Sequence, residues 1–66
     1  MYTKIYEITN DFGMTAYQYD PTEEELGHSI IFVQKCAAGG NVHVHLMSDE
    51  EARQFQLDCG IIREEA

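Results

Sequence analysis

Residues 29–36 read SIIFVQKC and contain the continuous apolar run 30–33. An uninterrupted apolar run of this length, without the alternation of a half-exposed strand, fits a strand that is covered on both faces or paired centrally. We therefore expect this segment to form the middle strand of a sheet.

Residues on the carboxyl side of this run predict a second strand and a hairpin. Residues 37–41 are small or turn-forming, and in residues 42–46 valine and leucine alternate with His43 and His45. This alternation is typical of a strand with one apolar face, here formed by Val42, Val44 and Leu46.

Residues on the amino side predict another hairpin. Residues 2–9 are rich in aromatic and β-branched side chains, with Tyr2, Tyr6 and Ile8 at a period of two. Residues 10–13 favour a turn, and the alternation resumes over 14–19, which places Tyr17 and Tyr19 on one side.

The two remaining segments differ in their helix signals. In residues 20–27, which are acidic, we expect a loop with at most one or two helical turns. Ser48 and Glu51 form the Ser-x-x-Glu pattern of a capping box, which predicts a helix that begins at Asp49 and ends near Gly60. The expected fold class is thus α+β: one domain, residues 1–66, with a small antiparallel four-stranded sheet of two hairpins and one C-terminal helix packed on a face.

The net charge restricts the classes of partner. Lys and Arg number 4 against 12 Asp and Glu, which gives a formal charge of -8. Nucleic acids and anionic membranes bind proteins mainly through cationic side chains, so we expect no direct nucleic-acid binding and no membrane partner. The chain has no apolar stretch of membrane-spanning length and no secretory signal, so we expect a complete small gene product that stays in the cytoplasm.

The acidic residues fall into groups that could together meet a basic surface of a partner protein. Such a surface could mimic nucleic acid, because spaced negative charges can occupy a phosphate-binding groove. The alternative is that acids favour helix starts and merely keep a small protein soluble. The acidic candidates for partner binding are Asp20, Glu23, Glu24, Glu25, Asp49, Glu50, Glu51, Asp58, Glu64 and Glu65.

A short, acidic chain without a catalytic motif resembles the small proteins with which bacteriophages and mobile elements block host nucleic-acid machinery. This resemblance implies a protein-binding inhibitor that acts as a DNA mimic in a host–virus interaction. Its target would be a nuclease, a CRISPR effector, as for an anti-CRISPR protein, or a polymerase.

Tyrosines support a different hypothesis, an interaction or homodimerisation module. Tyr17 and Tyr19 combine apolar area with a hydroxyl, which suits the centre of an interface. A sheet of this size also has two edges, one of which could pair with a second copy. In this hypothesis the charge serves solubility only.

The remaining chemistry-bearing residues are three histidines and two cysteines. His43 and His45 could form part of a metal-linked or pH-sensitive regulator, but two ligands are too few for zinc, so we assign no metal site and no cofactor. Cys36 and Cys59 are expected to be reduced and half-buried. Without a nucleophile and a base at a defined spacing, we do not expect an enzyme.

Overall fold

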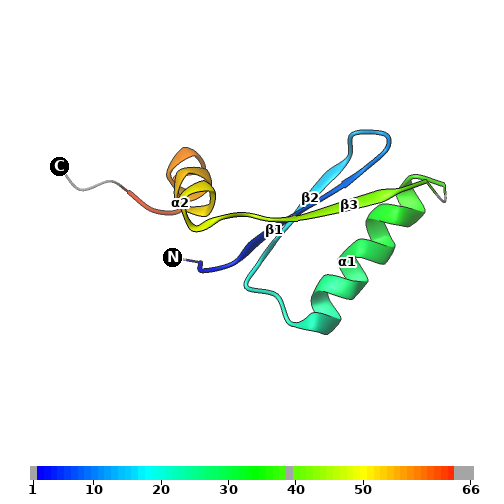
Figure 1. Cartoon of the computed structure of the whole chain (residues 1–66), viewed down its shortest axis with the longest axis horizontal. Coiled ribbons are helices and arrows are strands. Elements are labelled where there is room, and N and C mark those ends of the chain that lie inside the picture. The colour runs from blue at the N-terminus through cyan, green and yellow to red at the C-terminus, as the bar shows by residue number, and fades with distance from the viewer. Residues whose placement is uncertain (1, 39, 64–66) are drawn as a thin grey trace.

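The chain folds as a three-stranded antiparallel sheet with two helices. The computed structural model describes residues 2–38 and 40–63. Figure 1 shows α1 alongside the strands and α2 beyond one end of the sheet, near the N-terminus. The sheet order is β2-β1-β3, and the elements along the chain are β1 (Ile5–Asn10), β2 (Thr15–Tyr19), α1 (Glu23–Cys36), β3 (Val42–Leu46) and α2 (Asp49–Asp58).

The predicted four-stranded sheet with a single C-terminal helix is wrong, because residues 29–36 belong to helix α1 and not to a central strand. Thr22 and Glu25 form a complete capping box at the start of this helix. The apolar run is covered on only one side: Val33 is fully buried, whereas Ile31 and Phe32 are 50% and 59% exposed. Residues 23–27 of the predicted acidic loop are accordingly the start of a long helix, which begins after the N-cap Thr22.

The apolar stripe of α1 follows helical spacing. Leu26, Ile30, Val33 and Ala37 recur every three or four residues and are the partly or fully buried apolar positions on this segment. A run of four apolar residues contributes only two members to such a stripe. The spacing of the whole segment, and not its most apolar part, therefore identifies the helix.

The first hairpin is confirmed. Strands β1 and β2 are antiparallel, with Glu7 opposite Tyr17 and Ile5 opposite Tyr19. The Asn10 side chain shapes the turn, because its Oδ1 accepts from the backbone N–H groups of Phe12 and Met14. Its Nδ2 donates to the carbonyl of Val33, which ties the turn to α1.

The prediction of a second hairpin, between residues 29–36 and 42–46, is wrong because the segment before β3 is helical. Strand β3 pairs antiparallel with β1, with Ile8 opposite Val44 and Tyr6 opposite Leu46. Helix α1 is thus a crossover connection between β2 and β3, which point in the same direction on either side of β1.

The two helices contact opposite faces of the sheet. Gln18 of β2 donates to the Ser29 hydroxyl of α1, so the face of Tyr6, Ile8, Ala16 and Gln18 lies toward α1. Tyr17 lies on the other face, and its ring contacts Phe55 of α2. Five apolar side chains are buried among the described residues: Ile5, Ile8, Val33, Ala37 and Ala52.

Helix α2 begins at Asp49, as predicted from its capping box. The Ser48 hydroxyl accepts from the N–H of Glu51, and the Glu51 carboxylate accepts from the N–H of Ser48. Gly60 follows with a φ of 76°, a left-handed conformation that favours glycine after a helix. Neither helix is long and apolar enough to cross a bilayer, as far as residues 2–38 and 40–63 show.

Candidate functional site

A row of aromatic rings lies on the face of the sheet opposite α1. The ring centroids of Tyr2 and Tyr19 are 4.8 Å apart, those of Tyr19 and Phe55 6.3 Å, and those of Phe55 and Tyr17 4.7 Å. We call Tyr2, Tyr19, Phe55 and Tyr17 the aromatic row. These separations are within the range in which tilted rings attract one another.

The aromatic row is only partly covered. Tyr2, Tyr17 and Tyr19 are 41%, 37% and 36% exposed, and Phe55 is half-buried between the two tyrosines of β2. The row therefore does two things: it fastens α2 to the sheet, and it presents three tyrosines to solvent. The predicted placement of Tyr17 and Tyr19 on one side of β2 is confirmed.

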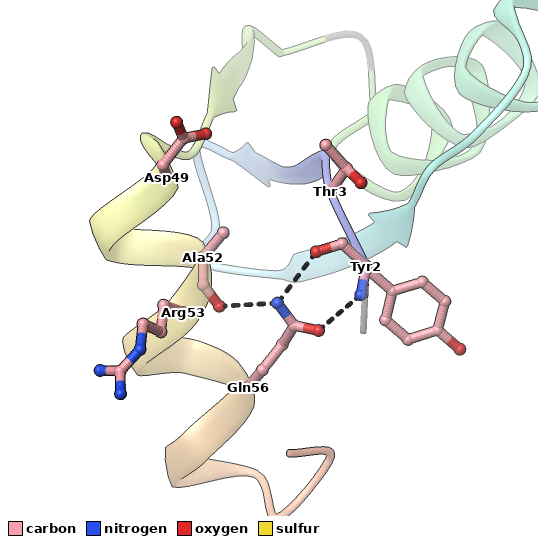
Figure 2. A pocket seen from close by; sticks show the side chains of 6 residues that line it. All are labelled: Tyr2, Thr3, Asp49, Ala52, Arg53 and Gln56. Carbon is pink, nitrogen blue, oxygen red and sulfur yellow. Dashed lines mark hydrogen bonds between the residues drawn. The ribbon is translucent and has the colours of Figure 1, made fainter. Parts of the chain in front are cut away.

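Tyr2 was expected to share a face with Tyr6 and Ile8, but it lies before β1 and stacks on Tyr19 instead. Gln56 of α2 holds it there, because the side-chain amide accepts from the Tyr2 N–H at 2.7 Å and donates to the Tyr2 carbonyl at 3.1 Å (Figure 2). Gln56 is 1% exposed and also donates to the carbonyl of Ala52. All hydrogen-bonding atoms of this buried amide thus have backbone partners.

A shallow hollow of about 410 Å³ lies beside this contact (Figure 2). Its charged residues are Asp49 and Arg53, both from α2. Because Gln56 is fully engaged with the backbone, it offers no free polar atom to a ligand there. The complete lining is Tyr2, Thr3, Asp49, Ala52, Arg53 and Gln56.

A carboxylate lies next to the aromatic row at the centre of the sheet. The Tyr17 hydroxyl donates to Glu7 Oε2 at 3.4 Å, and Glu7 is also opposite His45 in the register with β3. Burial and, second, the negative charge of Glu7 raise the pKa of Tyr17. Glu7 was not among the predicted site residues, although its position between Ile5 and Thr9 places it on this face by alternation alone.

The structure brings the predicted acidic groups partly together. Helix α1 follows Tyr19 of β2 and α2 follows Leu46 of β3, and both of these residues flank the first residues of β1. The two helix starts therefore lie at the same end of the sheet, but they belong to helices on opposite faces. The acids at this end are Asp20, Glu23, Glu24 and Glu25 on one side and Asp49, Glu50 and Glu51 on the other.

Of the other predicted acids, Asp58 is not part of this end. Asp58 is the last residue of α2, nine residues from Asp49, or about 14 Å along the helix at 1.5 Å per residue. Its Oδ1 accepts from Gln54. Glu64 and Glu65 lie outside the described residues.

Three of the acids are bound by the backbone of their own chain. Asp20 accepts from the N–H groups of Thr3 and Lys4, which lowers its pKa, with Lys4 the larger cause. In the capping boxes, hydrogen bonds from the backbone of Thr22 and of Ser48 lower the pKa of Glu25 and Glu51 respectively. These carboxylates therefore stabilise a turn and two helix starts, independently of any role in partner binding.

These lowered pKa values predict a loss of stability in acid. A carboxyl group whose pKa is lower in the folded state stabilises the fold above its ordinary pKa, here 3.8 for Asp and 4.5 for Glu, and this contribution is lost as the pH falls through the folded value. We expect the melting temperature, followed by circular dichroism, to fall below this range. The Glu25→Gln variant should show a smaller fall than the parent chain, and an equal fall in both would contradict this assignment.

The two histidines of β3 contact different carboxylates. His43 Nε2 lies 3.8 Å from Asp11 Oδ1, and His45 Nε2 lies 3.2 Å from Glu51 Oε2. Among residues 2–38 and 40–63, no three His, Cys, Asp or Glu side chains are placed to hold one metal ion. Cys36 and Cys59 are free and exposed, not half-buried as expected.

Comparisons with protein-family models, with curated proteins and with solved structures find no match. The features that bear on function are therefore the aromatic row, the carboxylates around it and the edges of the sheet.

Proposed function

We propose that this chain is a protein-binding module that recognises a cationic surface of another protein through the aromatic row and the carboxylates beside it. The observation that supports this most is the partial exposure of three tyrosines in one continuous row next to Glu7. Tyrosine is enriched at the energetic centres of protein interfaces, where its apolar ring is covered and its hydroxyl finds a partner.

Carboxylates near the row favour arginine or lysine as the side chains recognised. A guanidinium stacks on the face of an aromatic ring and pairs with a carboxylate in the same site. Glu7 is bound to the Tyr17 hydroxyl, and Asp20 directly follows Tyr19 and binds the backbone next to Tyr2. An arginine on the row would thus have a ring below it and a carboxylate at either end.

The acidic end of the sheet would contribute at long range. A formal charge of -8 attracts a basic partner and repels nucleic acid, and such steering raises the association rate more than it raises affinity. If the basic surface of the partner is a phosphate-binding groove, this chain would inhibit a nucleic-acid-binding protein. The net charge supports such a partner. The division of the acids between two faces, however, favours the aromatic row as the centre of the contact.

Titration with an arginine-rich peptide, followed by NMR, tests the proposal. We expect the largest shifts at Tyr17, Tyr19 and Glu7, and Tyr19→Ala should weaken binding about tenfold or more, as removal of a central aromatic residue does. Phe12→Ala is the matched control, because Phe12 is 73% exposed in the hairpin turn and is not part of the row. It should leave the affinity unchanged.

Other results would contradict the proposal. Equal binding by Tyr19→Ala and the parent chain, with shifts only at residues 23–25 and 49–51, would assign the contact to charge alone. Retained dispersion of the sheet amides in the Tyr19→Ala spectrum confirms that a loss of binding is not a loss of fold. In a parallel experiment, duplex DNA is added to the complex of this chain with a nucleic-acid-binding partner. DNA should displace the chain only if the chain occupies the partner's phosphate-binding groove.

We expect this recognition to need no catalytic step and no cofactor. We also expect it to occur in the cytoplasm, where the exposed thiols of Cys36 and Cys59 would remain reduced.

A further inference from the structure

The outer edge of β3 pairs with no further strand of residues 2–38 and 40–63. Strand β3 is the last strand in the sheet order, and the Met47 N–H donates to the Ile5 carbonyl of β1. In an antiparallel pair, successive residues point their N–H and C=O groups alternately toward and away from the neighbouring strand. His43 and His45 therefore bond to β1, whereas the backbone groups of Val42, Val44 and Leu46 point to the open edge.

Apolar side chains adjoin this edge on the face toward α1. Val44 and Leu46 are 45% and 47% exposed. Within the described residues no further strand pairs with β3, so two branched apolar side chains lie half-exposed along its outer edge.

The edge of β2 differs in its side chains. On the face toward α1 it presents Ala16 and Gln18, both half-buried, and Gln18 is bound to Ser29. On this face pairing at β2 would cover little apolar surface, so β3 is the edge at which a partner strand covers most apolar surface on the α1 side of the sheet.

We propose that a second copy of this chain pairs antiparallel with β3, about a two-fold axis at Val44, to form a continuous sheet of order β2-β1-β3-β3-β1-β2. In this arrangement Val44 lies opposite Val44 of the second copy, and Val42 lies opposite Leu46 of the second copy. Both α1 helices cover the same face, where the exposed valine and leucine side chains meet.

Charge favours a second copy as the occupant. β3 carries no acidic residue although the chain has a net charge of -8, so two copies can approach here with little repulsion between strands. On the other face His43 would lie opposite His45 of the second copy. Since His43 is beside Asp11 and His45 is beside Glu51, each histidine pair lies between two carboxylates.

The small core gives the pairing a physical reason. Only five apolar side chains are buried among the described residues, and chains of this size commonly gain stability from association. The aromatic row involves β2 and α2 and lies on the face away from α1, so the pairing at β3 does not depend on the proposed function.

Substitution of Val44 by a charged residue tests the pairing most sharply, because the two-fold axis places each new charge opposite an identical one. In sedimentation velocity over a concentration series, the parent chain should sediment as a dimer of two 7.6-kDa chains. Val44→Lys and Val44→Glu should each sediment as monomers. An equimolar mixture of the two should recover the dimer, because opposite charges then meet at the axis.

The matched control is Thr15→Lys, which places the same charge on the exposed edge strand β2 and should leave the dimer intact. Circular dichroism of each variant verifies the fold, and recovery in the mixture excludes misfolding as the cause of dissociation. A parent chain that stays monomeric at every concentration would overturn the proposal. A dimer that survives Val44→Lys, or that Thr15→Lys dissociates, would also overturn it.

Discussion

Replacing Ile8 with Ala should lower the free energy of unfolding by about 2–5 kcal/mol, the usual range for truncation of a buried isoleucine. Ile8 is fully buried on the central strand, on the face covered by α1. A chain of this length has a total stability of roughly 3–10 kcal/mol, so this substitution should remove a large share of it. Urea denaturation followed by circular dichroism measures the difference.

Ile31→Ala is the control for this experiment. It removes the same atoms from an exposed position of α1, so we expect a change of no more than about 0.5 kcal/mol in the monomer. Similar losses in both variants would mean that α1 does not pack on the sheet through the stripe that includes Val33. Because the proposed dimer would add to the stability of the chain, the comparison requires protein concentrations at which both variants are monomeric.

Replacing Phe55 with Ala should release α2 from the sheet while the rest of the fold persists. The Phe55 ring contacts both Tyr17 and Tyr19, and the loss of a half-buried aromatic ring should cost about 2 kcal/mol or more. Amide hydrogen exchange, followed by NMR, should show lost protection over Asp49–Asp58 and retained protection in β1 and α1. This variant should also bind the arginine-rich peptide less tightly, since the aromatic row is broken.

Gln54→Ala provides the comparison, because Gln54 is exposed on the same helix and its side-chain amide donates to Asp58 of α2. It should keep the protection of α2 unchanged. If Phe55→Ala also left protection unchanged, the Gln56 amide alone would be sufficient to hold α2. A uniform loss of protection in all elements would instead mean that α2 folds together with the sheet as one cooperative unit.

Local signals predicted two parts of the fold well. The hairpin of β1 and β2 depends on alternation and on the turn residues around Asn10, and the start of α2 depends on Ser48 and Glu51. Each of these signals lies within a few residues of the structure it determines. Neighbouring residues alone therefore specify this hairpin and this helix start.

Helix α1 was missed because two signals in one segment disagree. Isoleucine, phenylalanine and valine in succession favour a buried strand, while Thr22 and Glu25 repeat the capping pattern that correctly predicted α2. The helix forms because its stripe fits the face of Ile8, and Ile31 and Phe32 are left in solvent. Tertiary packing thus overrode the local β preference.

The candidate site was only partly predictable for a related reason. Alternation alone places Tyr17 and Tyr19 on one face. The approach of Tyr2 and Phe55 depends on where α2 lies relative to the sheet, and no short-range pattern encodes that position. The acidic groups were recognised from composition, but their division between two faces follows from the crossover of α1.

The contact between Gln56 and Tyr2 joins positions 54 residues apart in the sequence. Closing so large a loop costs chain entropy before any contact is gained, whereas the hairpin and the two capped helices close only short loops. This contact should therefore be the last to form on the route to the native state. The Gln56 side-chain amide would then join the backbone at Tyr2 to α2 only after the sheet and both helices have formed.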